Sequence, residues 1–573
     1  MMQQESGHFL ASPYGAAFAV GNDDESVWGG QAGLQRPAWS VDDYREWLKE
    51  GFSTTADDAT STFSIDVDTG AYSLVRQQLV DYGSLPPPGG VRIEELINYF
   101  DYDYPEPSGE VPVSITSEVG PCPWDSDHRL VHVGLQGRHV APAAVPPRNL
   151  VFLVDVSGSM GASLPLVISS LTYLSEQLGE RDTISIVVYA GSSGTVLPPT
   201  SGADKATILG ALERLQAGGS TNGGEGIQLA YALAREHFVE GGINRVMLAT
   251  DGDFNVGLTD HDALVELIEH ERRSGVFLSV LGFGGSNYQD VTMEQLADHG
   301  NGNYAYIDGL AEARKVLVEQ AGSTLITIAK DVKIQVELDP AVVKSYRLVG
   351  YDNRVLADRD FADDTKDAGE IGAGHTVTAL YEVELEEDAA AGDPLMELRL
   401  RYKEPDGARS KLVEVAVRDE GRSLAQSSDD FRFSAAVAGF GLRLQGAPSK
   451  TEPGSLEDLR DLARDARGGD HHCRRAELVS LVERASGLMG HPLEPTVSHC
   501  VPTPEPPPTV ARPLPVLDDV GADAAADAST SGEGGEPFDW KRFVVEVLYL
   551  LPPLLALPLF VMALRRPRRR RRD

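Results

Sequence analysis

Five side chains with oxygen ligands stand where apolar runs end or glycines cluster: Asp155, Ser157, Ser159, Thr221 and Asp251. The first three form the pattern D-x-S-x-S directly after the apolar run Leu150–Val154. The threonine lies in the glycine-rich stretch 218–224, and the last aspartate follows a second apolar run, 245–249. Hard divalent cations prefer such oxygen ligands, and Mg²⁺ keeps several of its waters. The pattern therefore predicts a site for Mg²⁺, or for Mn²⁺ or Ca²⁺.

The segment 149–322 supplies the elements that must position these side chains. Short β-branched runs alternate with amphipathic helical stretches, which favours an α/β fold with a doubly wound, mostly parallel sheet. The expected strands are Leu150–Val154, Ile184–Tyr189, Arg245–Ala249 and Val276–Leu281, with a short edge strand at Thr195–Leu197. Ligands of such sheets gather at the carboxyl ends of strands where the strand order reverses. We expect the five candidate ligands to lie there.

Strand-like runs lie on both sides of this α/β segment. They include Val113–Val119 and Leu130–Gly134 before it, and Val332–Leu338 and Thr376–Leu385 after it. Few helical patterns interrupt them, so sheet-on-sheet packing is expected. Either one β-sandwich contains the α/β domain as an insertion, or two separate β units flank it. Apolar residues at helical spacing then return in Phe431–Gly487 and predict a small helical unit.

The ends of the chain differ from this body. Phe543–Leu564 is a 22-residue, mostly apolar stretch followed by an arginine cluster, which predicts one transmembrane helix with a cytoplasmic tail. The body would then be extracytoplasmic, in the periplasm or at the cell surface. No basic region precedes an apolar stretch at the start, which leaves three arrangements open: an upstream start, another export route, or a cytoplasmic tail-anchored body.

The predicted division of the chain has seven parts. They are a leader or flexible segment (1–58), an N-terminal flanking domain (59–148), the α/β domain (149–322), a β-sandwich-like domain (323–425), a helical C-terminal domain (426–489), a Pro/Ala/Gly/Asp-rich linker (490–540), and the transmembrane helix with its Arg-rich tail (541–573).

Charge and cysteine content exclude some functions. The 50 Lys and Arg residues against 87 Asp and Glu residues leave a formal net charge of −37, which argues against a nucleic-acid partner. The three cysteines, Cys122, Cys473 and Cys500, form neither a disulfide scaffold nor a metal-finger pattern. The run 470–473, Asp-His-His-Cys, resembles a metal cluster, but adjacent side chains point in different directions, which favours an ordinary polar surface.

Two kinds of enzyme also place a reactive residue after a buried strand. An aspartyl-nucleophile phosphatase needs a second acid two residues after its aspartate, and this chain has Ser157 there. A serine hydrolase needs a nucleophile elbow and a histidine base. The glycines around Ser159 have the wrong spacing for such an elbow, and no histidine stands out as a partner. We therefore expect no catalytic residues and no enzyme activity.

The D-x-S-x-S pattern, Thr221 and Asp251 together resemble the metal-ion-dependent adhesion site of von Willebrand factor type A (VWA) domains. Outside that segment, Ser64–Tyr72, Val91–Phe100, Thr250–Gly257 and Lys344–Tyr351 resemble the bacterial YfbK-like VWA family. The resemblance extends over roughly residues 59–489. It implies envelope-associated proteins, and in VWA domains the serine and threonine hydroxyls ligate the metal while the two aspartates act directly or through water.

These features together predict a membrane-anchored VWA protein. Few carboxylates would contact the metal, so it would keep positive character and an open position for an Asp or Glu of a protein partner. Two alternatives stay open. A scaffold or assembly factor would hold its complex without metal-bridged recognition, and a metal-dependent hydrolase would turn over phosphate or ester substrates. The aromatic and acidic run Asn98–Pro105 is either a partner-binding strip or, as we expect, packing beneath the flanking β unit.

Overall fold

The computed structural model describes residues 51–141, 144–219, 223–252, 261–284, 290–405, 407–446, 455–496 and 500. Residues 1–50 of the predicted leader (1–58), most of the predicted linker and the segment 541–573 lie outside these residues. Among the residues that are described, no helix is both long and apolar enough to cross a membrane. The predicted membrane segment Phe543–Leu564 is not among them.

A six-stranded sheet forms the centre of the α/β block. Its strand order is β10-β9-β8-β5-β6-β7, with every neighbouring pair parallel except β6 and β7. The strands are β5 (Arg148–Asp155), β6 (Thr183–Tyr189), β7 (Ser193–Ser201), β8 (Ile243–Thr250), β9 (Phe277–Gly282) and β10 (Tyr304–Tyr306). The predicted α/β fold with a mostly parallel sheet is confirmed for this block.

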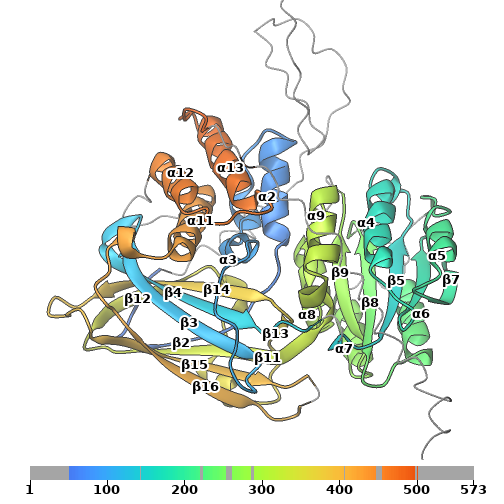
Figure 1. Ribbon diagram of the computed structural model, residues 1–573, viewed down its shortest axis with the longest axis horizontal. Helices are drawn as coiled ribbons and strands as arrows, with labels where there is room; N and C mark the ends of the chain where they lie inside the picture. Colours follow the sequence, from blue (N-terminus) through green and yellow to red (C-terminus); the bar gives the residue numbers. More distant parts are fainter. Residues whose placement is uncertain are drawn as a thin grey trace, which may run out of the picture. The chain divides into compact units, whose positions relative to one another are not determined.

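Helices cover both faces of this sheet because successive side chains of a strand point to opposite faces. Figure 1 shows the helices around this sheet. Leu150, Phe152 and Val154 of β5 belong to the core beneath α4 and α5, whereas Val151 and Leu153 belong to the core beneath α6, α7 and α8. The helices are α4 (Leu164–Glu176), α5 (Lys205–Leu212), α6 (Gly223–Glu236), α7 (His261–Arg272), α8 (Asp290–His299), α9 (Leu310–Arg314) and α10 (Ala321–Leu325), with a π-helical turn, η5 (Lys315–Glu319), between the last two.

Two antiparallel sheets enclose a second core. One has the order β1-β12-β14-β4-β3, and the other has β13-β11-β15-β16 with β2 also paired to β11. The strands are β1 (Ser53–Thr54), β2 (Thr60–Ser64), β3 (Val113–Cys122), β4 (Asp125–Gly137), β11 (Thr327–Leu338), β12 (Val343–Val349), β13 (Gly369–Gly372), β14 (Thr376–Leu385), β15 (Pro394–Lys403) and β16 (Lys411–Arg418). Their facing side chains form one apolar cluster, which includes Val133, Ile334, Tyr381 and Leu398.

Both sheets combine strands from before and after the α/β block in sequence. Strand β14 pairs with β4, and β11 pairs with β2, so the segments that were predicted as separate domains 59–148 and 323–425 share these sheets. Residues 51–58, predicted as the end of a flexible leader, are also ordered within this unit, since Ser53 and Thr54 pair with β12. A two-residue strand is too short to show alternation in the sequence.

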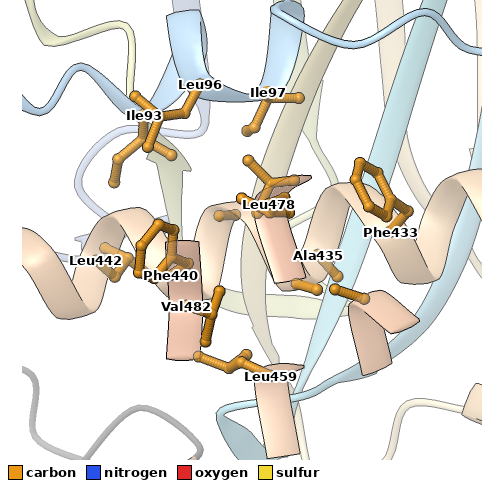
Figure 2. Packing of buried hydrophobic residues seen from close by; sticks show 14 of the residues in the cluster. Ile93, Leu96, Ile97, Phe433, Ala435, Phe440, Leu442, Leu459, Leu478 and Val482 are labelled. Atoms are coloured by element: carbon orange, nitrogen blue, oxygen red, sulfur yellow. The ribbon is translucent and has the colours of Figure 1, made fainter. Parts of the chain in front are cut away.

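A helical layer combines the two ends of the described chain. The helices are α2 (Gly70–Val80), α3 (Ile93–Asn98), α11 (Asp429–Gln445), α12 (Leu456–Asp465) and α13 (Arg474–Leu488). Ile93, Leu96 and Ile97 of α3 face Phe440 and Leu478 of the C-terminal helices (Figure 2). The apolar residues expected to be packing faces of Phe431–Gly487 therefore bury themselves partly against the N-terminal flank.

A disulfide bond joins Cys473, at the start of α13, to Cys500. The sequence did not predict it, since the two cysteines are 27 positions apart in a chain with only three. Cys122 is a buried free thiol.

Candidate metal centre

Asp155 is the last residue of β5, and Asp251 follows the end of the neighbouring strand β8. The strand order reverses between these two strands, because β6 follows β5 on one side while β8 lies on the other. Both carboxylates thus lie at the carboxyl edge of the sheet, at the point where ligands of doubly wound sheets bind. The structure brings these two predicted residues together as expected from their strands.

Hydrogen bonds fix the carboxylate of Asp155. Its Oδ1 accepts the backbone N–H of Ser157 at 2.8 Å, and its Oδ2 accepts the hydroxyl of Thr250 at 3.1 Å. The Thr250 hydroxyl in turn accepts the backbone N–H of Gly252 at 3.1 Å. Because both oxygens have a donor, the carboxylate has one orientation at the floor of the site.

The two serines connect this floor to the surface. Ser157 Oγ lies 3.0 Å from Ser159 Oγ. Asp155 and Ser157 are buried, whereas Ser159 is exposed at the start of the short 3-10 helix η4 (Ser159–Gly161). The site therefore has a buried anionic base and an open mouth lined by a hydroxyl.

The glycine-rich loop before Thr221 lies directly beside the D-x-S-x-S turn. Gly158 donates its N–H to the carbonyl of Gly219 at 3.1 Å, and Gly218 donates to the carbonyl of Val156 at 2.7 Å. Gly219 has a φ of +95°, a backbone conformation that side chains with a Cβ rarely adopt. Thr221 itself lies outside the described residues, so its place among the ligands stays a prediction.

Electrostatics at this site favour a cation. Burial, together with the nearby charge of Asp251, raises the pKa of Asp155 to about 6, although hydrogen bonds from Ser157 and Thr250 oppose the shift. Asp251 is itself only 7% exposed. Two partly desolvated carboxylates beside two hydroxyls form an all-oxygen donor set, which suits a hard divalent cation.

Sequence reasoning missed Thr250, which holds Asp155 from the adjacent strand. The signal was present, since Thr250 stands between the apolar run 245–249 and Asp251, as the last residue of β8. A hydroxyl buried at a strand end needs a partner, and the neighbouring strand end offers a carboxylate.

Among the described residues, two further groups of potential metal ligands lie outside this site. In the first, His128 Nδ1 is 2.6 Å from Glu382 Oε1 and 3.3 Å from Asp125 Oδ2. Glu382 also accepts the Trp124 indole N–H at 2.9 Å and pairs with Arg347 at 2.6 Å. The oxygens of Glu382 thus already have donors within the protein, as in a structural ion pair. The second group, Asp66, Glu95 and Glu294, is fully buried.

The run 470–473 has a structural role in place of metal binding. Cys473 is in the disulfide and has no thiolate to offer. Asp470 accepts the backbone N–H groups of Arg475 at 3.1 Å and Ala476 at 2.8 Å, and so caps the start of α13. The polar-surface interpretation of this run was nearer to the structure than a metal cluster.

The aromatic and acidic run 98–105 also packs inside the molecule. Tyr99, Phe100, Tyr102 and Tyr104 are all buried. Tyr99 stacks on Tyr72 of α2 with ring centres 3.8 Å apart, and Phe100 meets Phe433 of α11 edge to face at 4.8 Å. These contacts favour the packing interpretation over a partner-binding strip.

Three sequence families match successive parts of the chain. Residues 149–320 match the von Willebrand factor type A domain, and residues 39–132 match a family described as von Willebrand factor. Residues 323–488 match the family described as "Uncharacterized protein YfbK, C-terminal".

The chain is 42% identical to the protein YfbK of Escherichia coli (strain K12) over 471 residues, which cover 78% of this chain and 81% of that protein. It is 32% identical to the Synechocystis protein sll0103 over 168 residues, 29% of this chain and 39% of that protein. Among solved structures, a von Willebrand factor type A protein from Catenulispora acidiphila matches 64% of this chain and 90% of its own, with 16% identity and a TM-score of 0.39. The chain therefore belongs to the YfbK family and contains a von Willebrand factor type A domain.

Proposed function

We propose that the VWA domain binds a protein partner through a divalent metal held by Asp155, Ser157, Ser159, Thr221 and Asp251. VWA domains typically mediate protein–protein interaction. The observation that carries the proposal is the carboxylate of Asp155, which two donors hold at the carboxyl edge of the sheet, where the strand order reverses. Mg²⁺ is the expected ion, with Mn²⁺ or Ca²⁺ as substitutes.

The donor set explains why adhesion is favoured over hydrolysis. Only two of the five proposed ligands are carboxylates, so a bound divalent ion would keep positive character and accept a partner's Asp or Glu. The protein's own contribution is to hold the buried carboxylate still and to leave the Ser159 side exposed. No histidine among the described residues hydrogen-bonds to Ser157 or Ser159, so neither hydroxyl has a general base of that kind.

We further propose that the body lies on the extracytoplasmic side of a membrane, with Phe543–Leu564 as anchor. The Cys473–Cys500 disulfide supports this location, because such bonds persist mainly in oxidising compartments. The arginine cluster after residue 564 supports the same orientation. Alkylation of intact cells with a maleimide reagent tests it. The proposal expects a single reactive cysteine after denaturation, and three reactive cysteines would contradict it.

The adhesion proposal is tested with the immobilised full-length chain, its Asp155→Ala variant, and an envelope protein extract. The expected result is a protein retained by the wild type in Mg²⁺, lost in EDTA, lost in Asp155→Ala, and displaced by free acetate. Asp388→Ala is the matched control, since this aspartate is exposed in the loop between β14 and β15.

The alternatives give different results in the same experiment. Retention by Asp155→Ala in EDTA would support a scaffold without metal-bridged recognition. Turnover of a phosphate or ester substrate that Asp155→Ala abolishes would support a hydrolase.

A further inference from the structure

A cluster of five buried carboxylates lies where three segments of the chain meet. Asp66 and Asp68 lie between β2 and α2, Glu94 and Glu95 lie on α3, and Glu294 lies on α8 of the VWA domain. All five are at most 3% exposed. We call them the buried acidic cluster. None of them contributes to the candidate metal centre at Asp155.

Two arginines partly balance this charge. Arg354 Nη2 lies 3.2 Å from Asp66, 3.4 Å from Asp68 and 3.1 Å from Glu294. Arg92 pairs with Glu95 and lies 3.6 Å from Glu294. If every group is ionised, five carboxylates against two guanidinium groups leave an excess of three negative charges. Asp298 adds a further carboxylate at the rim, 2.5 Å from Arg354.

One carboxylate oxygen of Asp66 has no partner in the described part of the chain. Its Oδ1 accepts the backbone N–H of Asp68 at 3.0 Å and faces Arg354. Its Oδ2 is buried and has no hydrogen-bond partner among the described residues. Buried charged oxygens are normally hydrogen-bonded or bound to a metal. This unpartnered oxygen and the excess of negative charge both point to a bound cation.

Three of these carboxylates stand close enough together to share one cation. One oxygen each from Asp66, Glu95 and Glu294 lies within 4.8 Å of the others. Ca²⁺ accepts oxygen ligands in a flexible geometry, whereas Mg²⁺ demands a nearly ideal octahedron and keeps several waters, so a set of buried carboxylates favours Ca²⁺. We propose that Asp66, Glu95 and Glu294 form a second, structural cation site whose preferred ion is Ca²⁺.

A cation here would join the VWA domain to its flanks. Glu294 comes from α8, whereas Asp66 and Glu95 come from the N-terminal flank, and Arg354 comes from the loop after β12. Asn353 in that loop also donates to Glu294 at 2.6 Å, and Asp68 accepts the backbone N–H of Tyr304 of β10 at 2.8 Å. Binding would therefore clamp one edge of the VWA sheet to the segment 66–95.

Counting bound Ca²⁺ in the full-length chain tests the site. Bound Ca²⁺ is measured by elemental analysis after equilibrium dialysis. The Asp155→Ala protein is expected to retain one Ca²⁺ per chain. The double variants Asp155→Ala/Asp66→Asn and Asp155→Ala/Glu294→Gln are expected to retain none. Asp155→Ala/Asp388→Asn is the control and is expected to keep the ion. The melting temperature of Asp155→Ala should rise with Ca²⁺, a shift absent from the two cluster variants.

Two results would overturn the proposal. One is an Asp155→Ala protein that binds no Ca²⁺. This result would show that Arg92 and Arg354 alone balance the buried carboxylates, and it does not depend on whether the cluster variants fold. The other is a folded double variant that still holds its ion, which would place the ion elsewhere, for example at Asp125, His128 and Glu382.

Discussion

The candidate metal centre at Asp155, here called the VWA site, and the buried acidic cluster are both acidic, but they are built in opposite ways. Asp155 and Asp251 stand at the edge of one sheet, and the hydroxyl of Ser157 connects the turn after Asp155 to the exposed Ser159. The buried acidic cluster has more carboxylates and two arginines, and it has no exposed member. A site with few charges and an open side suits an exchangeable contact with a partner, whereas a closed and charge-rich site suits a fixed structural role.

The two sites also differ in how the chain assembles them. One β-strand and its following turn supply Asp155, Ser157 and Ser159. The cluster needs α3, α8 and the loop after β12 to arrive together. Damage to the cluster should therefore affect the stability of the whole body, and damage to the VWA site should affect mainly ligand binding.

The largest effect is expected at Arg354. Arg354→Met leaves Asp66, Asp68 and Glu294 with fewer buried charge partners, and removing one partner of a buried ion pair typically costs about 3–5 kcal/mol. Urea denaturation in EGTA measures the loss. Arg359→Met is the control, because Arg359 is 89% exposed and its nearest acid is 3.7 Å away. If the two variants lost the same free energy of unfolding, the buried acidic cluster would have no special role in stability, and the contrast with the VWA site would fail.

Thr250→Val should have a smaller effect on stability. It removes the donor to Asp155 Oδ2 and the acceptor of the Gly252 N–H, both buried, at a cost of about 1–2 kcal/mol. The measurement is the same denaturation in EDTA. Thr200→Val, on the edge strand β7, should cost much less because its hydroxyl is more exposed. A loss at Thr250 no larger than this control would mean that Asp155 is not held from β8.

Mg²⁺ affinity at the VWA site should depend on pH. The pKa of Asp155 in the folded chain, about 6, lies above its ordinary value of 3.8, so without metal the protonated form stabilises the fold at low pH, and this contribution is lost as pH rises through that interval. Metal binding needs the ionised form of Asp155, so Mg²⁺ affinity should rise with pH. Affinity should fall about tenfold per pH unit below pH 6. Calorimetry across this range measures it, and a constant affinity would contradict the assignment of Asp155.

Ser159→Ala should change stability least. Its side chain is exposed, so the free energy of unfolding should stay within about 0.5 kcal/mol of the wild type. Mg²⁺ affinity should nevertheless fall about tenfold, equivalent to about 1.4 kcal/mol for one lost ligand. Ser201→Ala, an exposed serine of β7, should leave both quantities unchanged. Unchanged affinity in Ser159→Ala would exclude that hydroxyl as a ligand.

Local patterns predicted the α/β sheet and the position of Asp155, because a strand, a turn and a helix are encoded within a few consecutive residues. The strand pattern 150–154 became the central strand β5, and the predicted edge strand 195–197 lies within β7. Asp251 followed from the same logic, since parallel strands end at one edge.

Contacts between distant segments were not predictable in this way. Glu294 of α8, Asp66 and Asp68 had no apparent role in the sequence. The cluster exists only because β2 pairs with β11 and thereby fixes the segment before α2. The disulfide between Cys473 and Cys500 likewise depends on where α13 begins in three dimensions.

Calorimetric titration of Mg²⁺ into the metal-free chain tests the central claim most directly. Both proteins carry Glu294→Gln, which removes one ligand of the proposed second cation site, and one also carries Asp155→Ala. The account predicts saturable binding at one site in the first protein and none in the second. Identical isotherms in the two proteins would contradict a metal centre at Asp155.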